Sequence, residues 1–125
     1  MHMNTTLSYL LFLAVLVPAT SHADGNDLLS RCGATVAFMD DKKAEVDSLY
    51  VGHCLGLMEG VMDVNRLYQT TLDKKNLYFC APENGIDRKQ TARIVVKYLK
   101  EHPEILHENE TILTVKALSA AYPCK

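Results

Sequence analysis

Positive charge is scarce in this chain, and no stretch of Lys and Arg residues gathers along any one segment. Lys and Arg number 13 against 15 Asp and Glu, which gives a formal net charge of −2. A protein that binds the phosphate backbone of a nucleic acid ordinarily carries a basic stripe. The pairs Lys42-Lys43 and Lys74-Lys75 stand alone and are expected in solvent. We therefore expect no nucleic-acid partner.

Long hydrophobic runs are also missing, apart from one near the beginning of the chain. Residues 7–17 are almost all apolar, but they are fewer than the roughly 20 residues that span a bilayer. Pro18 and then small or polar residues ending at Ala23 follow, an arrangement typical of a signal peptide, although no Lys or Arg precedes the run. We predict that residues 1–23 are cleaved, leaving residues 24–125 as one exported domain without a membrane span.

Closely spaced metal ligands are absent from the sequence, which has no C-x-x-C and no H-x-x-x-H pair. His53 and Cys54 are neighbours, but neighbouring helical residues point about 100° apart. All four cysteines, Cys32, Cys54, Cys80 and Cys124, follow the predicted signal peptide. An even number of cysteines in a small exported chain indicates a disulfide framework. We expect two disulfides and no cofactor, with a metal centre as the competing interpretation.

Apolar residues recur every three or four positions in four segments, a spacing that predicts amphipathic helices. The first segment covers about residues 27–39 and the second, longer one about residues 44–72. Asp87 is expected to cap a third helix, which Pro103 ends. A fourth helix then runs from Pro103 until Pro123 stops it. The sequence predicts an all-α fold, a small disulfide-stapled bundle of about four helices.

Short turns make successive helices antiparallel, and this arrangement suggests how the cysteines pair. Cys32 lies about two turns before the first connection and Cys54 a little further after it, so the two come level across the hairpin. Cys80 precedes the third helix and Cys124 follows the fourth, so those ends also meet. Among the three possible connectivities we favour Cys32 with Cys54 and Cys80 with Cys124. Loop closure makes each bridge worth roughly 3 to 4 kcal/mol of stability.

Three glycines, Gly52, Gly56 and Gly60, follow one another at intervals of four in the second helix. Each costs about 1 kcal/mol of helix propensity relative to alanine. The spacing places all three near one face, where another backbone could approach closely. Packing against another helix of the same chain and a contact between two copies in a homodimer are both compatible with this row.

Many residues of the mature chain resemble, in order and spacing, one known family. The segments that carry the resemblance are Cys54-Leu55-Gly56 with Gly60 and Asp63, Phe79-Cys80-Ala81-Pro82, Gln90, Val95-Val96, Tyr98-Leu99, His102-Pro103-Glu104, Leu106-His107, Ala117-Leu118 and Ala121-Tyr122-Pro123-Cys124. They are similar to the Rap/Tai immunity proteins, which are periplasmic, mostly helical and often dimeric. Members of that family neutralise type VI secretion amidases that cut peptidoglycan peptides. Leu57 departs from the pattern, because many relatives have an aromatic residue there.

The resemblance implies a periplasmic inhibitor, not an enzyme, whose partner is a peptidoglycan amidase effector with a cysteine and a histidine in its active site. Family members block the groove of that enzyme by inserting a protruding loop. In this chain we expect the loop of residues 73–87 to do so, because Tyr and Asn side chains give contact area and hydrogen bonds at low entropic cost. The residues expected to contact the partner are Lys74, Lys75, Asn76, Tyr78, Glu83 and Asn84. The competing interpretation is a loop that only connects two helices and is anchored by Cys80.

A different class of function is an acid-stress chaperone of the HdeA type, also small, helical, disulfide-bonded and periplasmic. Such a protein needs carboxylates and histidines whose protonation loosens an interface. His53, His102 and His107 offer some pH sensitivity but are scattered along the sequence. An enzyme is the weakest interpretation, because nothing in the sequence supplies a nucleophile or a metal beside carboxylates such as Glu101 and Glu104.

Overall fold

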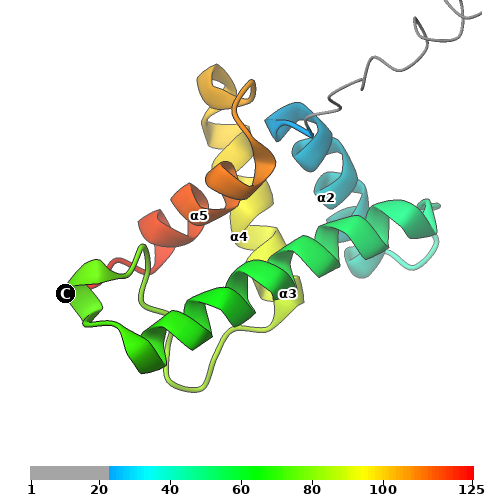
Figure 1. Cartoon of the computed structure of the whole chain (residues 1–125). Helices are drawn as coiled ribbons and strands as arrows, with labels where there is room; N and C mark the ends of the chain where they lie inside the picture. The colour runs from blue at the N-terminus through cyan, green and yellow to red at the C-terminus, as the bar shows by residue number, and fades with distance from the viewer. Residues whose placement is uncertain (1–22) are drawn as a thin grey trace, which may run out of the picture.

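The computed structural model describes residues 23–125, so the predicted signal peptide, apart from its last residue, lies outside the described residues. Four α-helices are present there, and two short 3₁₀ turns, η1 and η2, interrupt the loops between them. The elements are α2 (Gly25–Asp40), α3 (Ser48–Thr71), η1 (Lys74–Asn76), α4 (Arg88–Glu101), η2 (Pro103–Ile105) and α5 (Glu110–Ala121). Figure 1 shows the long helix α3 in front, α2 against its first half, and α4 crossing behind it beside α5. The predicted all-α bundle of four helices is confirmed.

Each helix begins at an acidic or amide side chain that accepts hydrogen bonds from backbone N–H groups of the first turn. These groups would otherwise lack a partner, because the first four N–H groups of a helix have no carbonyl to bond within it. The bonds run from Asn26 and Asp27 to Asp24, from Leu49 to Asp47, from Lys89 to Asp87, and from Thr111 and Ile112 to Asn109. The prediction that Asp87 caps the third helix is therefore confirmed.

Two predicted helix boundaries were wrong, and the same capping groups explain both. The second helix begins at Ser48, not near residue 44, because the Asp47 side chain caps it. The last helix begins at Glu110, not at Pro103, because Asn109 caps it. Pro103 instead opens the η2 turn, a position that its fixed φ and missing N–H allow.

The core forms where α4 crosses the other helices. Its inward face is buried along the whole helix, at Thr91, Ala92, Val95, Val96 and Leu99. Leu28 of α2, Met58 of α3 and Leu113 of α5 pack in the same cluster, and all three side chains are fully buried. A smaller cluster of Met62, Phe79 and Leu118 joins α3, the loop after it and α5. None of the helices within residues 23–125 has both the length and the apolar character needed to cross a membrane.

Both predicted disulfides are present with the predicted pairing. Cys32 and Cys54 join α2 to α3 across a Cα–Cα distance of 5.1 Å. Cys80 and Cys124 join the loop after α3 to the segment after α5 at 4.9 Å. Figure 1 shows the effect of the Cys80–Cys124 bridge, since the C-terminus lies beside the loop that follows α3. The two bridges therefore fix opposite ends of the bundle.

The start of α2 packs tightly against the segment that precedes α5. The N–H of Gly25 donates to the carbonyl of Glu108 at 3.0 Å, and the N–H of Glu110 donates to the carbonyl of Ala23 at 3.3 Å. A Cβ atom on Gly25 would lie 2.8 Å from the carbonyl oxygen of Leu106, so the absence of a side chain is required here. This contact sets the position of the first turn of α5.

Candidate functional site

The loop of residues 73–87 is held at its centre and exposed on both sides of that anchor. Phe79 is buried, with 1% of its surface exposed, and the N–H of Cys80 donates to the carbonyl of Tyr122 at 2.9 Å. The Ser119 hydroxyl of α5 donates to the carbonyl of Tyr78 at 2.7 Å. Together with the Cys80–Cys124 bridge, these contacts fix the loop against the C-terminal end of α5.

The six residues expected to contact a partner are all exposed, but the structure does not gather them in one place. Lys74, Lys75 and Asn76 form η1, and Tyr78 follows with 75% of its surface exposed. Glu83 and Asn84 lie in the next turn, which closes with a hydrogen bond from the N–H of Gly85 to the carbonyl of Pro82 at 2.8 Å. Gly85 has a φ of 74°, which favours glycine.

Tyr78 stands beside an apolar groove of about 450 Å³ between α3 and α5, here called the α3–α5 groove. Gly56 and Gly60 of the glycine row form part of its wall, together with exposed apolar side chains from the second half of α3. Its lining residues are Gly56, Leu57, Gly60, Val61, Val64, Asn65, Tyr68, Tyr78, Phe79, Thr111 and Val115. Val64 and Tyr68 are 51% and 44% exposed and stand together along this groove, so they form part of one apolar patch.

A second hollow of about 800 Å³, the α4–α5 groove, lies on the other side of Tyr78 and shares Thr111 and Val115 with the first. Its wall includes Ile112, which is 52% exposed, and the corner after α4. The two grooves together make one surface centred on Tyr78, which we call the Tyr78 face. A contiguous apolar surface of this kind is typical of a protein-binding site.

The corner after α4 is arranged by local contacts. His102 is the C-cap residue of α4, and its backbone N–H donates to the carbonyl of Leu99 at 3.3 Å. Its ring lies 4.3 Å from the Tyr98 ring and has Nδ1 3.1 Å from Oε1 of Glu104. The N–H of Glu104 itself and the His102 ring both hold the pKa of Glu104 below its ordinary value. These contacts give this corner a structural role.

The glycine row faces open space in the folded chain. A Cβ atom built on Gly52, Gly56 or Gly60 would meet no heavy atom within 4 Å. Packing within the chain therefore does not require the missing side chains. The row remains available to a second copy of the chain or to another protein.

Sequence reasoning missed the exposed apolar residues of the Tyr78 face. Helical spacing alone does not separate exposed from buried apolar residues, and Tyr68 of α3 and Ile112 of α5 fit that spacing although they are 44% and 52% exposed. The available signal was that apolar residues occupy more of the circumference of α3 than one buried stripe needs. An excess of that kind indicates either a second buried face or a binding surface.

The side chains of residues 23–125 form no group of three or more His, Cys, Asp or Glu residues that could hold a metal ion. All four cysteines are in disulfides, so no free thiol is present in this part of the chain. The chemistry that this surface offers is recognition: apolar contact area, exposed aromatic rings and a loop of fixed position. The fold is a small, disulfide-stapled helical bundle with an exposed apolar surface around Tyr78.

Comparison with known proteins identifies the family. The model of the Rap1a immunity proteins matches residues 24–124, and the chain belongs to that family. Membership gives the chain an immunity role, in which an immunity protein binds an effector protein. No significant match was found among curated proteins or solved structures.

Proposed function

We propose that the exported chain is a periplasmic immunity protein that binds and inhibits a type VI secretion peptidoglycan amidase. It acts as a stoichiometric inhibitor and not as an enzyme. The observation that carries the proposal is membership of the Rap1a immunity family together with a disulfide-anchored loop that presents Tyr78 to solvent. The two disulfides agree with export, because disulfides persist in oxidising compartments such as the periplasm.

The inhibitory element in this proposal is the loop of residues 73–87, which occludes the Cys-His groove of the amidase. An inserted loop must keep its shape, because ordering a flexible loop on binding costs free energy. Here the buried Phe79 and the Cys80–Cys124 bridge hold the loop before any partner arrives. Tyr78 supplies the large contact area, and Lys74, Lys75 and Asn76 supply polar contacts around it.

A homodimer belongs to the same proposal. The glycine row and the exposed Val64 and Tyr68 lie on one face of α3, and no side chain or backbone of residues 23–125 covers that row. Two such helices can approach closely where side chains are missing. Tyr78 also lines the α4–α5 groove, so in this arrangement the effector reaches Tyr78 and the polar residues of the loop from that side.

Protection of living cells tests the proposal. A panel of type VI amidases is directed to the periplasm of a sensitive bacterium, with and without the full chain and its own leader. The proposal predicts that the chain prevents lysis by at least one amidase and that both proteins are recovered together from the periplasm. Lysis by every amidase at full expression of the chain contradicts it.

A matched pair of variants separates occlusion from other modes of protection. Tyr78→Ala removes an aromatic ring from the loop, and Leu49→Ala removes an equally exposed side chain, 76% against 75%, from the start of α3. We expect protection to fail with Tyr78→Ala and to persist with Leu49→Ala. Equal protection by both variants would contradict the role given to the loop.

A further inference from the structure

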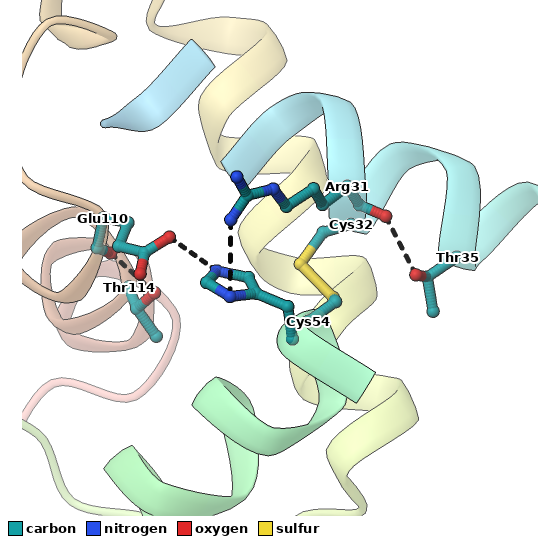
Figure 2. The surroundings of a disulfide bond; sticks show 7 residues. Arg31, Cys32, Thr35, Cys54, Glu110 and Thr114 are labelled. Atoms are coloured by element: carbon teal, nitrogen blue, oxygen red, sulfur yellow. Dashed lines mark hydrogen bonds and ion pairs between the residues drawn. A yellow bond between two sulfur atoms is a disulfide. The ribbon is translucent and has the colours of Figure 1, made fainter. Parts of the chain in front are cut away.

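His53 lies at a junction of three helices and contacts a charged side chain of each neighbouring helix. Its Nε2 atom is 2.7 Å from Oε2 of Glu110 at the start of α5. Its Nδ1 atom is 3.4 Å from Nη1 of Arg31 on α2. Figure 2 shows Arg31 and Glu110 reaching toward the same ring beside the Cys32–Cys54 disulfide. The imidazole thus joins α2, α3 and α5 through side chains.

The two contacts fix the protonation state that fits this geometry. A guanidinium group can only donate hydrogen bonds, and an ionised carboxylate can only accept them. Nδ1 must therefore present its lone pair to Arg31, while Nε2 must carry the hydrogen donated to Glu110. The neutral ring with hydrogen on Nε2 satisfies both partners. A protonated ring carries hydrogen on both nitrogens, so it keeps the hydrogen bond to Glu110. It loses the bond to Arg31, because both groups are then hydrogen-bond donors and both are positively charged.

We propose that His53 is a proton-controlled switch that exchanges the partner of Arg31. When the ring is neutral, Arg31 bonds to His53 and ties α2 to α3. When the ring is protonated, Arg31 turns to Asp27, one helical turn earlier on α2, and the bond between His53 and Glu110 strengthens. The structure already holds both contacts of Arg31, with Nη2 4.0 Å from Oδ1 of Asp27, so the exchange releases the bond to His53 and shortens an ion pair that exists.

The charges around His53 support an exchange confined to these groups. Arg31 faces it from α2 and pairs with Asp27 of the same helix, and Glu110 faces it from α5. The ion pairs of α4 to the neighbouring helices lead elsewhere, from Arg88 to Glu59 and from Arg93 to Asp40. Among the contacts described for residues 23–125, the charged partners of His53 are therefore one carboxylate, Glu110, and one cation, Arg31.

The covalent frame around the switch stays fixed during the exchange. Arg31 precedes Cys32, and His53 precedes Cys54, so the disulfide keeps α2 and α3 together in both states. The carbonyl of Glu110 accepts a hydrogen bond from the Thr114 hydroxyl at 2.8 Å, within α5. The switch therefore changes surface contacts and leaves the fold intact.

The change reaches the surface in a hollow of about 520 Å³. Its lining residues are Arg31, Ser48, Leu49, Tyr50, Gly52 and His53. Protonation adds a positive charge to this hollow and withdraws the guanidinium from the ring. The charge of the ring therefore alters the surface of this hollow.

Double-mutant cycles at two pH values test the switch. Arg31→Met and His53→Leu, alone and together, give the coupling between these two residues from the unfolding equilibrium in urea. We expect a stabilising coupling of about threefold in the unfolding constant at pH 8, in the usual range for partly exposed pairs. At pH 5 the coupling should vanish or become destabilising. The coupling between His53 and Glu110, from a cycle with Glu110→Gln, should instead grow at pH 5.

A coupling between Arg31 and His53 that is the same at both pH values would overturn the proposal. Nuclear magnetic resonance of the imidazole nitrogens gives a second test that needs no variant. At pH 8 we expect hydrogen on Nε2 of His53, and hydrogen on Nδ1 would also overturn the proposal. His102 is the internal control, because its Nδ1 atom faces Glu104 and should carry the hydrogen in the neutral ring.

Discussion

The hydroxyl of Ser119 donates a hydrogen bond of 2.7 Å to the carbonyl of Tyr78, so an aromatic ring that is 75% exposed is held by a fixed backbone. The next residue, Phe79, is buried, and Cys80 is joined to Cys124. Exposure of a large ring on an anchored backbone is favourable for binding, because little freedom is lost when a partner covers it.

Replacing Tyr78 by alanine should weaken inhibition of the amidase and leave the fold unchanged. The ring contributes little to the core, so the free energy of unfolding should change by less than about 0.5 kcal/mol. Aromatic residues at the centre of an interface commonly contribute 2 kcal/mol or more, or roughly thirtyfold in affinity. Calorimetric titration of the amidase measures the affinity, with Leu49→Ala as the control. Unchanged affinity for Tyr78→Ala would contradict the proposed binding surface.

The two disulfides should differ in their effect on inhibition. Loss of either bridge, by Cys32→Ser with Cys54→Ser or by Cys80→Ser with Cys124→Ser, should lower the stability by roughly 3 to 4 kcal/mol. Only the second pair should also reduce inhibition under conditions where both variants remain folded, because only that bridge anchors the loop. Circular dichroism establishes folding, and residual amidase activity measures inhibition. If the two variants inhibited the amidase equally, the Cys80–Cys124 bridge would stabilise the fold without contributing to inhibition, which would contradict this prediction.

Alanine at Gly56 and Gly60 should stabilise the chain and weaken its self-association. Each added methyl group meets open space and removes a helix-interior glycine, which is worth about 0.5 to 1 kcal/mol. The same methyl groups would separate two α3 helices that pack along the glycine row. Gly33→Ala is the control, since that glycine also faces open space but lies on α2. Analytical ultracentrifugation measures association, and an undiminished dimer in the Gly56→Ala, Gly60→Ala variant would exclude this face from the contact.

Acid should remove the contribution of Asp24 to stability. The N–H of Asp27, followed by the Asn26 side chain and N–H, holds the pKa of the Asp24 carboxyl below its ordinary value of 3.8. A carboxyl whose pKa is lowered by folding stabilises the fold above its ordinary pKa, and this contribution is lost as the pH falls through the lowered value. Asp24→Asn keeps a capping side chain but does not titrate. The stability difference between the two proteins should therefore shrink from pH 6 to about pH 2, and a constant difference in urea titrations would contradict this.

Much of the fold could be predicted from the sequence because its determinants are local. Helical spacing, the cap at Asp87 and the antiparallel order of successive helices led to four helices and to both disulfide pairs. The boundaries at Asp47 and Asn109 were missed because apolar residues on both sides of each cap keep a helical spacing, at Val46 and Leu49 and at Ile105 and Ile112. The choice between a cap and a continued helix is decided by the packing of the whole chain.

The sites were less predictable because they depend on contacts between distant segments. The loop of residues 73–87 was visible from its composition and its cysteine. The groove beside Tyr78 was not, since it forms only where α3 and α5 meet. The contact between His53 and Glu110 joins residues 57 positions apart, and no local pattern reveals it.

Titration of a cognate amidase with the purified exported chain tests the central claim most directly, with release of peptidoglycan fragments as the readout. The proposed function predicts that cleavage falls in proportion to the added chain and ends when the two proteins are present in stoichiometric amounts. The proposal would be contradicted if every type VI amidase of the panel still cleaved peptidoglycan fully when the chain was added in large molar excess over the amidase.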